Sequence, residues 1–333
     1  MKTASTPVRF LLPALLLAAS AAALFCAQAA AQHDPLGKID AAVQAGQADA
    51  ALAAIRSLPQ GGANNAAAQN LACRIHYALR QWDAAVDECQ RAVRLDGGNA
   101  RYHLWLARAL GEKASHASFF TAYSLGKNTR AEFEEAARLN PRDGEILSDL
   151  GEFYREAPGI VGGGMDKAER IARQLETVDP ARAHQLWANI AESRHDFTTA
   201  EREYRAAVSA SPHPALHWTT LASFFRRRQR WQDLDSAIRN ASTSASHDRA
   251  ATIAIYDAAG VLIESNRDPA LAAKLLEAYI ASSTRTEEGP TFEACLRLAK
   301  LKYALGDRAA AERQRAAALA LAHDYKPALE AKF

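Results

Sequence analysis

The most regular feature of the chain is the spacing of its apolar residues, which recur at steps of three and four positions in segment after segment. Runs with an apolar residue at every second position are missing, and alanine dominates the sequence. This period is that of an amphipathic helix, so the pattern predicts an all-α protein. Glycine and proline fall mostly between the periodic segments, for example at residues 58–62, 140–141 and 179–180, where they predict helix ends.

The predicted helices also repeat a short motif. The clearest unit places an aromatic residue, a leucine beside a small residue and a second aromatic residue on one helix, at Trp218, Leu221, Ala222 and Phe225. An earlier unit has a similar order at Leu150, Gly151 and Tyr154, with a second helix that contains Ala168. Small residues at Gly151 and Ala168 would let two helices approach closely.

This order resembles the tetratricopeptide (TPR) repeat, in which two antiparallel helices form a hairpin. About eight such hairpins fit between Leu36 and the C-terminus at close to the 34-residue period of that family. The resemblance implies a TPR-like α-solenoid, a right-handed superhelix whose first helices line a concave groove. Two stretches exceed the period, residues 97–141 by about ten positions and residues 141–180 by about five.

The groove is where the resemblance implies that a protein or peptide binds. Its candidate residues are the polar ones interleaved with the buried positions of the first helices, and they carry both signs of charge. Such a lining suits a peptide with charged side chains or a free carboxylate, which arginine grips with two hydrogen bonds. Alternatively, these are ordinary surface residues of a scaffold. The candidates are Arg101, Arg108, Glu152, Arg155, Asn189, Ser223 and Arg226.

The first long stretch contains an unusually apolar insertion at residues 115–130. A helical extension would place Phe119, Phe120 and Tyr123 on one face, because they lie three and four positions apart. We expect this face to pack on the neighbouring repeat. The alternative is that it projects as a partner-binding patch.

The second long stretch contains a glycine-rich insertion at residues 157–164. Backbone amides of Gly162, Gly163 and Gly164 could cradle an anion ahead of the next helix, which Asp166 is expected to cap. No Gly-Lys-Ser/Thr sequence follows, so the match to phosphate-binding loops fails. We therefore favour a shaped connector held by inward packing of Ile160 and Val161.

The N-terminus has the order of a secretory signal peptide. Lys2 and Arg9 precede an apolar stretch, and small residues follow around Ala27 and Ala29. We assign residues 1–31 to the signal and residues 32–333 to the helical domain, and we expect a periplasmic or secreted protein with no transmembrane segment in its mature part. Lipid attachment at Cys26 is disfavoured because the large Phe25 precedes it.

Export places three cysteines in an oxidising compartment, Cys73, Cys89 and Cys295. The first two fall on the antiparallel helices of one predicted hairpin, at heights where facing side chains meet, so they are our disulfide candidate. Cys295 lies in a helix with no histidine at a suggestive spacing, which favours a buried thiol.

Charge and chemistry narrow the function further. Removing Lys2 and Arg9 from 40 basic residues leaves 38 against 38 acidic ones, and a neutral chain is a poor nucleic-acid binder. The single dense basic run, at residues 226–230, fits a solvated helix end.

No nucleophile with its base, carboxylate pair or metal cluster stands out, so we expect neither an enzyme, nor a cofactor, nor a metal. His213 and His217 are four apart, but Pro214 between them marks a helix start and no third ligand is indicated.

One segment carries a further resemblance. The stretch from Tyr154 to Lys167 is similar to one found in a group of uncharacterised exported bacterial TPR proteins. The chain also resembles, more distantly, periplasmic helical-repeat components of substrate-uptake systems. The expected function is therefore an exported scaffold that binds a protein or peptide. The alternative is a small-molecule-binding accessory subunit of a TRAP-type uptake system, and a closed apolar pocket around Phe119, Phe120 and Tyr123 would distinguish it.

Overall fold

The computed structural model describes residues 34–333 of the chain. Within these residues there are 17 α-helices, three short 3-10 segments and no β-strand, which confirms the predicted fold class. The predicted signal peptide and Cys26 lie outside the described residues. No helix of residues 34–333 combines the length and the apolar character that a membrane crossing requires. Residues from Ile39 to Phe333 form one compact unit, to which the following description applies.

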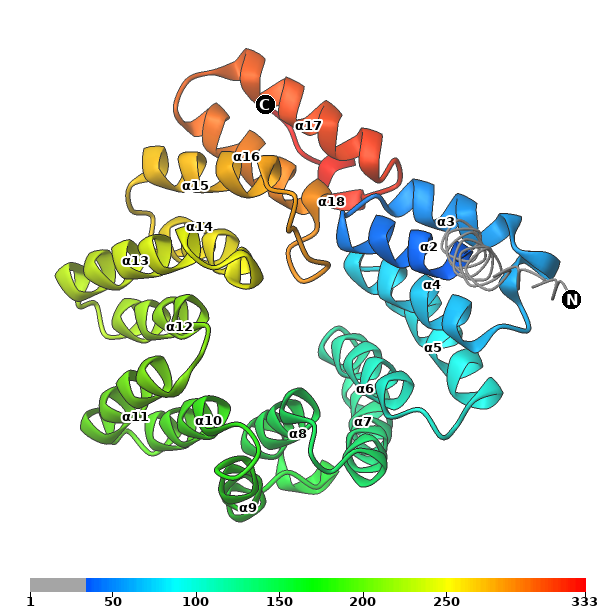
Figure 1. The fold of residues 1–333 in the computed structure, drawn as a ribbon, viewed down its shortest axis with the longest axis horizontal. Helices are drawn as coiled ribbons and strands as arrows, with labels where there is room; N and C mark the ends of the chain where they lie inside the picture. Colours follow the sequence, from blue (N-terminus) through cyan, green and yellow to red (C-terminus); the bar gives the residue numbers. More distant parts are fainter. Residues whose placement is uncertain (1–33) are drawn as a thin grey trace, which may run out of the picture. The chain divides into compact units, whose positions relative to one another are not determined.

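The helices pair into eight consecutive hairpins, as the repeat predicts. In Figure 1 the hairpins follow a curve, with the first helices α8, α10, α12 and α14 on its inner side. The first helices are α2 (Pro35–Gln44), α4 (Ala66–Ala78), α6 (Ala100–Ser115), α8 (Gly144–Glu156), α10 (Pro180–Ser193), α12 (Pro214–Arg227), α14 (Ile253–Glu264) and α16 (Thr291–Ala304). The second helices are α3 (Ala48–Ser57), α5 (Trp82–Leu95), α7 (Phe119–Leu139), α9 (Met165–Leu175), α11 (Phe197–Ala210), α13 (Trp231–Ser246), α15 (Pro269–Ala281) and α17 (Arg308–Leu321), and the short α18 (Lys326–Leu329) packs against α17.

Local sequence explains where many of these helices begin and turn. Asparagine or aspartate side chains accept hydrogen bonds from the first free amides of several helices, for example at Asn65, Asp143 and Asp179. In six hairpins a residue with positive φ lies two positions after the end of the first helix. Only two of these residues are glycines, and the other four accept a left-handed conformation that L-residues disfavour. The six are Gly46, Arg80, His195, Gln229, Asn266 and Gly306.

Small residues allow the helices to approach as the sequence predicts. A Cβ atom added to Gly151 would lie 2.4 Å from Cδ2 of Leu186 on the next hairpin, so no larger residue fits without a shift. Ala168, on the partner helix of the same hairpin, is fully buried. Alanine occupies the equivalent buried positions of other second helices, at Ala85, Ala200 and Ala272. Close contact between hairpins therefore rests on residues that have almost no side chain.

The first insertion lengthens α7 to 21 residues, so its helical extension is confirmed. The expected packing of its aromatic face is wrong, because Phe119 is 70% exposed and Phe120 is 85% exposed. Tyr123 is also exposed and lies beneath the ammonium group of Lys127. Within residues 34–333 no neighbouring helix buries these rings, although Phe119 and Tyr123 line a groove together with residues of α6 and α8.

The glycine-rich insertion is a connector built on its own backbone. The amides of Gly162, Gly163 and Gly164 donate to the carbonyls of Gly159, Pro158 and Tyr154. These amides are therefore not available to an anion, and the anion cradle considered from the sequence does not form. Val161 is buried as expected, whereas Ile160 points outward and is exposed. Helix α9 is not capped by the Asp166 side chain, because Asp166 lies in its first turn.

The two ends of this unit meet, which the sequence did not predict. Thr291 donates from Oγ1 to the carbonyl of Ala45, and His323 Nδ1 lies 2.8 Å from Asp49 Oδ1. A Cβ atom on Gly46 would approach the Thr291 amide nitrogen to 2.4 Å, so glycine is required at this junction. Helix α3 contacts α17, and Figure 1 shows the blue and red ends side by side. The row of hairpins therefore closes into a ring, and we call the junction the seam.

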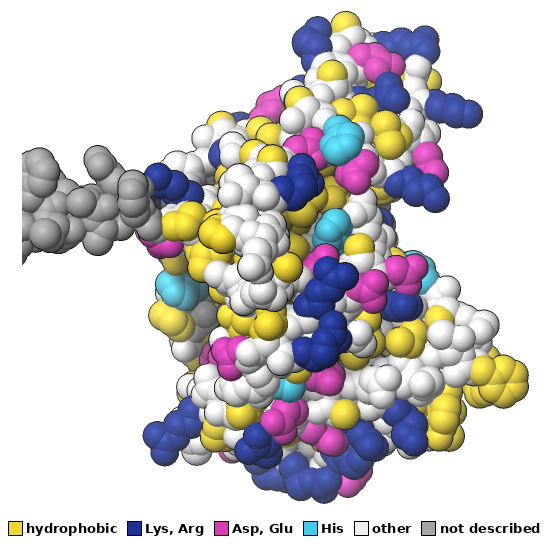
Figure 2. Space-filling view, turned by 90° about the vertical axis from the view of Figure 1, so that its right-hand side faces the viewer, with side chains coloured by type: hydrophobic (Ala, Val, Ile, Leu, Met, Phe, Trp, Pro, Cys, Tyr) yellow, Lys and Arg dark blue, Asp and Glu magenta, His cyan; other side chains and the backbone are white. Residues whose placement is uncertain are grey.

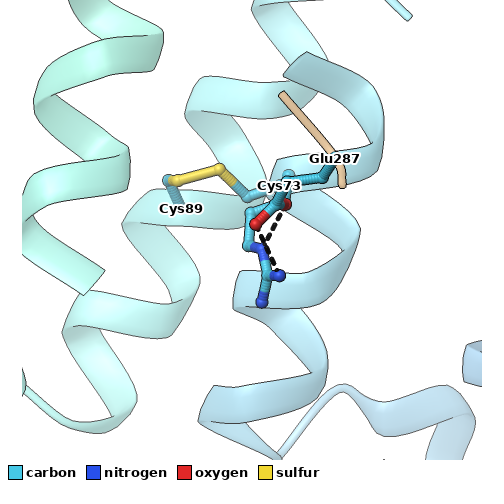
Figure 3. The surroundings of a disulfide bond; sticks show 4 residues. Cys73, Cys89 and Glu287 are labelled. Carbon is cyan, nitrogen blue, oxygen red and sulfur yellow. Dashed lines mark hydrogen bonds and ion pairs between the residues drawn. A yellow bond between two sulfur atoms is a disulfide. The ribbon is translucent and has the colours of Figure 1, made fainter. Parts of the chain in front are cut away.

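A disulfide lies next to the seam. Cys73 on α4 and Cys89 on α5 are bonded to each other across their hairpin, and both are fully buried. Figure 3 shows that the bond is adjacent to Glu287, which reaches over from the other end of the chain. Glu287 accepts two hydrogen bonds from Arg74, the residue after Cys73, at 2.7 and 2.8 Å. The disulfide thus holds together the hairpin on which the C-terminal end docks.

Replacement of both Cys73 and Cys89 by alanine should destabilise the protein. The bond spans a sequence separation of 16, and closing a loop of that length contributes about 3 kcal/mol in the chain-entropy estimate. Urea unfolding with and without reductant measures the loss. Reduced wild-type protein should lose a similar amount, whereas Cys295→Ala should keep the dependence on reductant. A wild-type protein equally stable in both conditions would contradict a stabilising disulfide.

Two neighbouring glycines provide a matched test of the connector. A Cβ atom at Gly163 would lie 1.8 Å from the carbonyl oxygen of Ala157, while one at Gly159 meets nothing within 4 Å. Gly163→Ala should therefore lower the free energy of unfolding by at least about 2 kcal/mol, and Gly159→Ala should change it by less than about 0.5 kcal/mol. Urea titrations of both variants measure the difference. Equal effects would mean that the connector is not packed as described.

Candidate functional site

Four hollows of the ring have the size of a binding site, and three of them contain predicted binding residues. One is a polar groove on the inner side, of about 550 Å³, between α8, α10 and α12. The second, of about 420 Å³, is an apolar groove between the two insertions. The third is a pocket of about 610 Å³ at the seam.

The polar groove brings three of the predicted candidates together. Glu152 and Arg155 come from one turn of α8, and Asn189 comes from the facing turn of α10. Arg155 Nε donates to Glu152 Oε2 at 2.7 Å, and the Asn189 amide donates to the other Glu152 oxygen. Burial raises the pKa of Glu152, against the opposing charge of Arg155. The three side chains therefore form one hydrogen-bonded set that links two hairpins.

Three further residues line this groove that were not among the predicted site residues: Tyr204, Glu192 and Arg227. The hydroxyl of Tyr204, from α11, lies 2.5 Å from Asn189 Oδ1 and 3.0 Å from Glu192 Oε2. Arg227, at the end of α12, donates to both oxygens of Glu192 at 2.7 and 2.8 Å. Tyr204 was recognisable as a repeat position of a second helix, but its contact with α10 required the fold.

Other predicted candidates hold neighbouring hairpins together. Arg108 donates to Asp149 at 2.7 Å and to Glu145 at 2.8 Å, and Arg101 donates to Glu145 at 2.6 Å, so both tie α6 to α8. Arg226 pairs with Glu264 at 2.9 Å and ties α12 to α14. Ser223 is half-buried on α12. A ligand carboxylate at these arginines would have to compete with carboxylates of the protein itself.

The apolar groove lies between the end of α6, the start of α7 and the glycine-rich connector. Phe119, Tyr123 and Ile160 form its exposed rim, and Phe153 and Val161 lie deeper. Phe120 stands beside Phe119, with ring centroids 5.7 Å apart, and does not line the groove. The groove is open to solvent along this rim, so it is not the closed pocket expected for a small-molecule carrier.

Glu156, at the C-terminus of α8, lines both the apolar and the polar groove. The two grooves therefore adjoin at this residue. An extended chain could lie with apolar side chains in one groove and polar or charged side chains in the other.

The basic run at residues 226–230 is engaged within the protein. Arg227 binds Glu192, Arg230 binds Glu201 and Asp233, and the Arg228 guanidinium lies 3.6 Å from the ring centroid of Phe197. Figure 2 shows basic and acidic side chains interspersed on one face of the molecule, without a broad area of either sign.

The remaining reactive groups are buried or paired. Burial raises the pKa of the Cys295 thiol to about 11, which makes it a poor nucleophile. The ring of His213 contacts Asp248 at 2.6 Å, and His217 is buried, which lowers its pKa to about 4.

Comparisons with known proteins support only partial likeness. No family model matches the chain, and no curated protein matches it. Among solved structures, a thermophilic TPR protein of Thermus thermophilus shares 20% identity, with a TM-score of 0.45, over 54% of this chain and 90% of its own. The MamA protein shares 18% identity, with a TM-score of 0.39, over 50% of this chain and 83% of its own. A human IFIT1 dimer shares 14% identity, with a TM-score of 0.43, over 84% and 70%. The fold assignment therefore rests on the hairpins of this chain.

Asp257 is an unusual carboxyl on α14. Its pKa is raised to about 7, first because the group is removed from water and then because of the negative charge of Glu288, while Arg297 acts in the opposite direction. No basic side chain of residues 34–333 forms an ion pair with it. Asp257 therefore holds a proton in the folded protein at pH values where the unfolded chain releases it.

Asp257→Asn should stabilise the protein in a pH-dependent way. The pKa of Asp257 is about 7 in the folded protein and 3.8 in the unfolded chain. The unfolded chain therefore releases this proton at a lower pH, so the free energy of unfolding of the wild type falls as pH rises from about 4 to 7. The variant should match wild type near pH 4 and exceed it by roughly 2 to 4 kcal/mol above pH 7. Urea unfolding across this range measures the difference, with exposed Asp87→Asn as control. A gain independent of pH would contradict the raised pKa.

Proposed function

We propose that the protein is an exported scaffold that binds a protein or peptide partner. The observation that carries the proposal is the apolar groove with its two exposed phenylalanines. Phe119 and Phe120 are 70% and 85% exposed, and burial of a phenylalanine side chain contributes about 1.5 to 3 kcal/mol. Two such rings beside a groove form a surface that a partner gains free energy by covering.

The partner's chemistry follows from the position of the two grooves on either side of Glu156. Apolar side chains would fill the space between Phe119, Tyr123 and Ile160. Polar or charged side chains would follow past Glu156 towards Arg155 and Asn189. We therefore propose a peptide segment with an apolar end and a polar end. The inner side of a solenoid is suited to this because each hairpin adds one further contact position.

Two observations support action outside the cytoplasm. Residues 1–31 have the pattern of a secretory signal. The disulfide between Cys73 and Cys89 is of a kind that persists in oxidising compartments and is rare in the cytosol of most organisms. We accordingly propose a periplasmic or secreted location.

A small-molecule-binding accessory subunit of an uptake system receives no support from this groove. That function called for a closed apolar pocket around Phe119, Phe120 and Tyr123, whereas these rings are exposed. Among the hollows of the ring, the apolar one opens to solvent along its rim, which favours contact with a macromolecule over enclosure of a metabolite.

Photo-crosslinking from Phe120 tests the proposal. A photoreactive phenylalanine analogue at position 120, introduced into the whole chain with its own N-terminal segment, should form a discrete adduct with one partner. Tyr303, which is 48% exposed on α16, provides a control position outside the groove. Ile160→Asp should reduce the adduct at least about tenfold, because it places a charge on the rim of the groove. Mass spectrometry of the adduct identifies the partner.

Three results would contradict parts of this proposal. No adduct at position 120, or equal adducts at positions 120 and 303, would count against a docking surface at the groove. An adduct that is insensitive to Ile160→Asp would place the contact elsewhere. Recovery of the chain and its adduct only from the cytoplasm, with residues 1–31 still attached, would contradict export without affecting the groove.

A further inference from the structure

The seam pocket is a second site, and its walls come from both ends of the chain. Helices α4 and α6 contribute Tyr77 and Trp105 from the N-terminal half. The segment before α16 contributes Glu287 and Glu288, which lie 182 to 211 positions further along the chain than Trp105 and Tyr77. The pocket, of about 610 Å³, therefore exists only because the ring is closed.

One side of the pocket is aromatic. The ring of Tyr77 meets those of Trp82 and Trp105 edge to face, with centroids 5.5 Å apart in both pairs. Trp82 in turn stacks on His116 with an angle of 10° between the ring planes. These contacts fix the rings as a wall rather than leaving them as separate side chains. The disulfide between α4 and α5 holds the two helices that carry Tyr77 and Trp82.

The wall already attracts positive charge. The guanidinium of Arg108 lies 4.9 Å from the Trp105 ring centroid, and that of Arg74 lies 5.8 Å from it. Both arginines are also matched by acids: Arg74 binds Glu287 and Asp40, and Arg108 binds Glu145 and Asp149. The third arginine of the pocket, Arg80, pairs with Glu293. An anionic ligand could bind one of these three arginines only by breaking an ion pair that the arginine already forms.

Two carboxylates of the pocket lack such partners. No basic side chain of residues 34–333 forms an ion pair with Glu112 or Glu288. Desolvation and the nearby carboxylates of Glu145 and Glu287 raise the pKa of Glu288, against the charges of Arg108 and Arg182. Burial and the carboxylate of Glu112 raise the pKa of Tyr77 to about 12. In both cases neighbouring carboxylates are among the causes of the raised pKa.

We propose that the seam pocket binds an organic cation, an alkylammonium or guanidinium group, between Glu112 and Glu288. The carbon chain next to the charge lies against Tyr77 and Trp82. This ligand class follows from the combination of aromatic rings, which attract cations and cover apolar chains, with two unmatched carboxylates. The volume also exceeds what a single hydrated metal ion fills.

Ligand binding and ring closure are coupled by this geometry. Glu112 belongs to the N-terminal half and Glu288 to the C-terminal end, so a cation between them bridges the seam. The bound cation therefore favours the closed ring over any state in which the ends separate. The site is distinct from the apolar groove, and its test does not depend on the proposed partner.

Calorimetric titration of the purified protein with cadaverine, a five-carbon diamine, tests the site. Cadaverine should bind, whereas pentanol, which has the same carbon chain without charge, and glutarate, which has two negative charges, should not. Glu112→Gln and Glu288→Gln should each weaken cadaverine binding at least about tenfold. Glu135→Gln, on the exposed face of α7, is the matched control and should bind as wild type does. Thermal unfolding without ligand checks that each variant is folded.

Several outcomes would overturn the proposal. A specific site should produce binding heat with cadaverine below about 10 mM, so silence up to that concentration counts against it. Binding that survives the double substitution Glu112→Gln and Glu288→Gln places the cation elsewhere. If glutarate binds as well as cadaverine, the pocket does not prefer a cation. If millimolar Ca²⁺ or Mg²⁺ displaces cadaverine, the two carboxylates form a metal site instead. Hydrogen exchange at residues 286–290 should slow with cadaverine, and an unchanged rate contradicts the coupling to ring closure.

Discussion

Every part of this molecule depends on the burial of apolar helix faces between successive hairpins. A single hairpin has too little interior to hide its own apolar surface, so it is stable only against its neighbours. The close approach of α8 and α10 at Gly151, which leaves no room for a Cβ atom, shows how tightly this contact is made. Because each hairpin repeats the same contact, the chain curves steadily and brings its first helices to the inner side.

Charged side chains add a second layer of contact on this inner side. Arg101, Arg108 and Arg226 each pair with an acid on the next hairpin. Half-exposed pairs of this kind contribute little stability individually, but they fix the orientation of neighbouring hairpins and neutralise the inner side. A charged ligand that binds on the inner side must therefore displace an existing ion pair of the protein. The apolar groove and the seam pocket differ in this respect, since each presents groups whose interactions are incomplete.

The seam lets the two ends of the row of hairpins cover each other. In an open solenoid the terminal hairpins each leave one face uncovered, whereas here α3 meets α17 and Glu287 reaches Arg74. The disulfide between Cys73 and Cys89 stiffens the hairpin on which this contact is made. Closure therefore removes exposed apolar ends and creates a pocket from parts that are distant along the chain.

The sequence alone determined the features that depend on local periodicity. The spacing of apolar residues predicts helices, the recurring small and aromatic positions predict hairpins, and the facing positions of Cys73 and Cys89 predict their proximity. Tertiary structure decided everything that depends on residues far apart. Phe119 and Phe120 belong to a predicted packed face, yet both side chains stay exposed. Arg108 has the place of a groove residue, yet its charge is taken by Glu145 and Asp149. Closure at Gly46 and Thr291 depends on small rotations summed over eight hairpins, and such a sum leaves no local signature in the residues that finally meet.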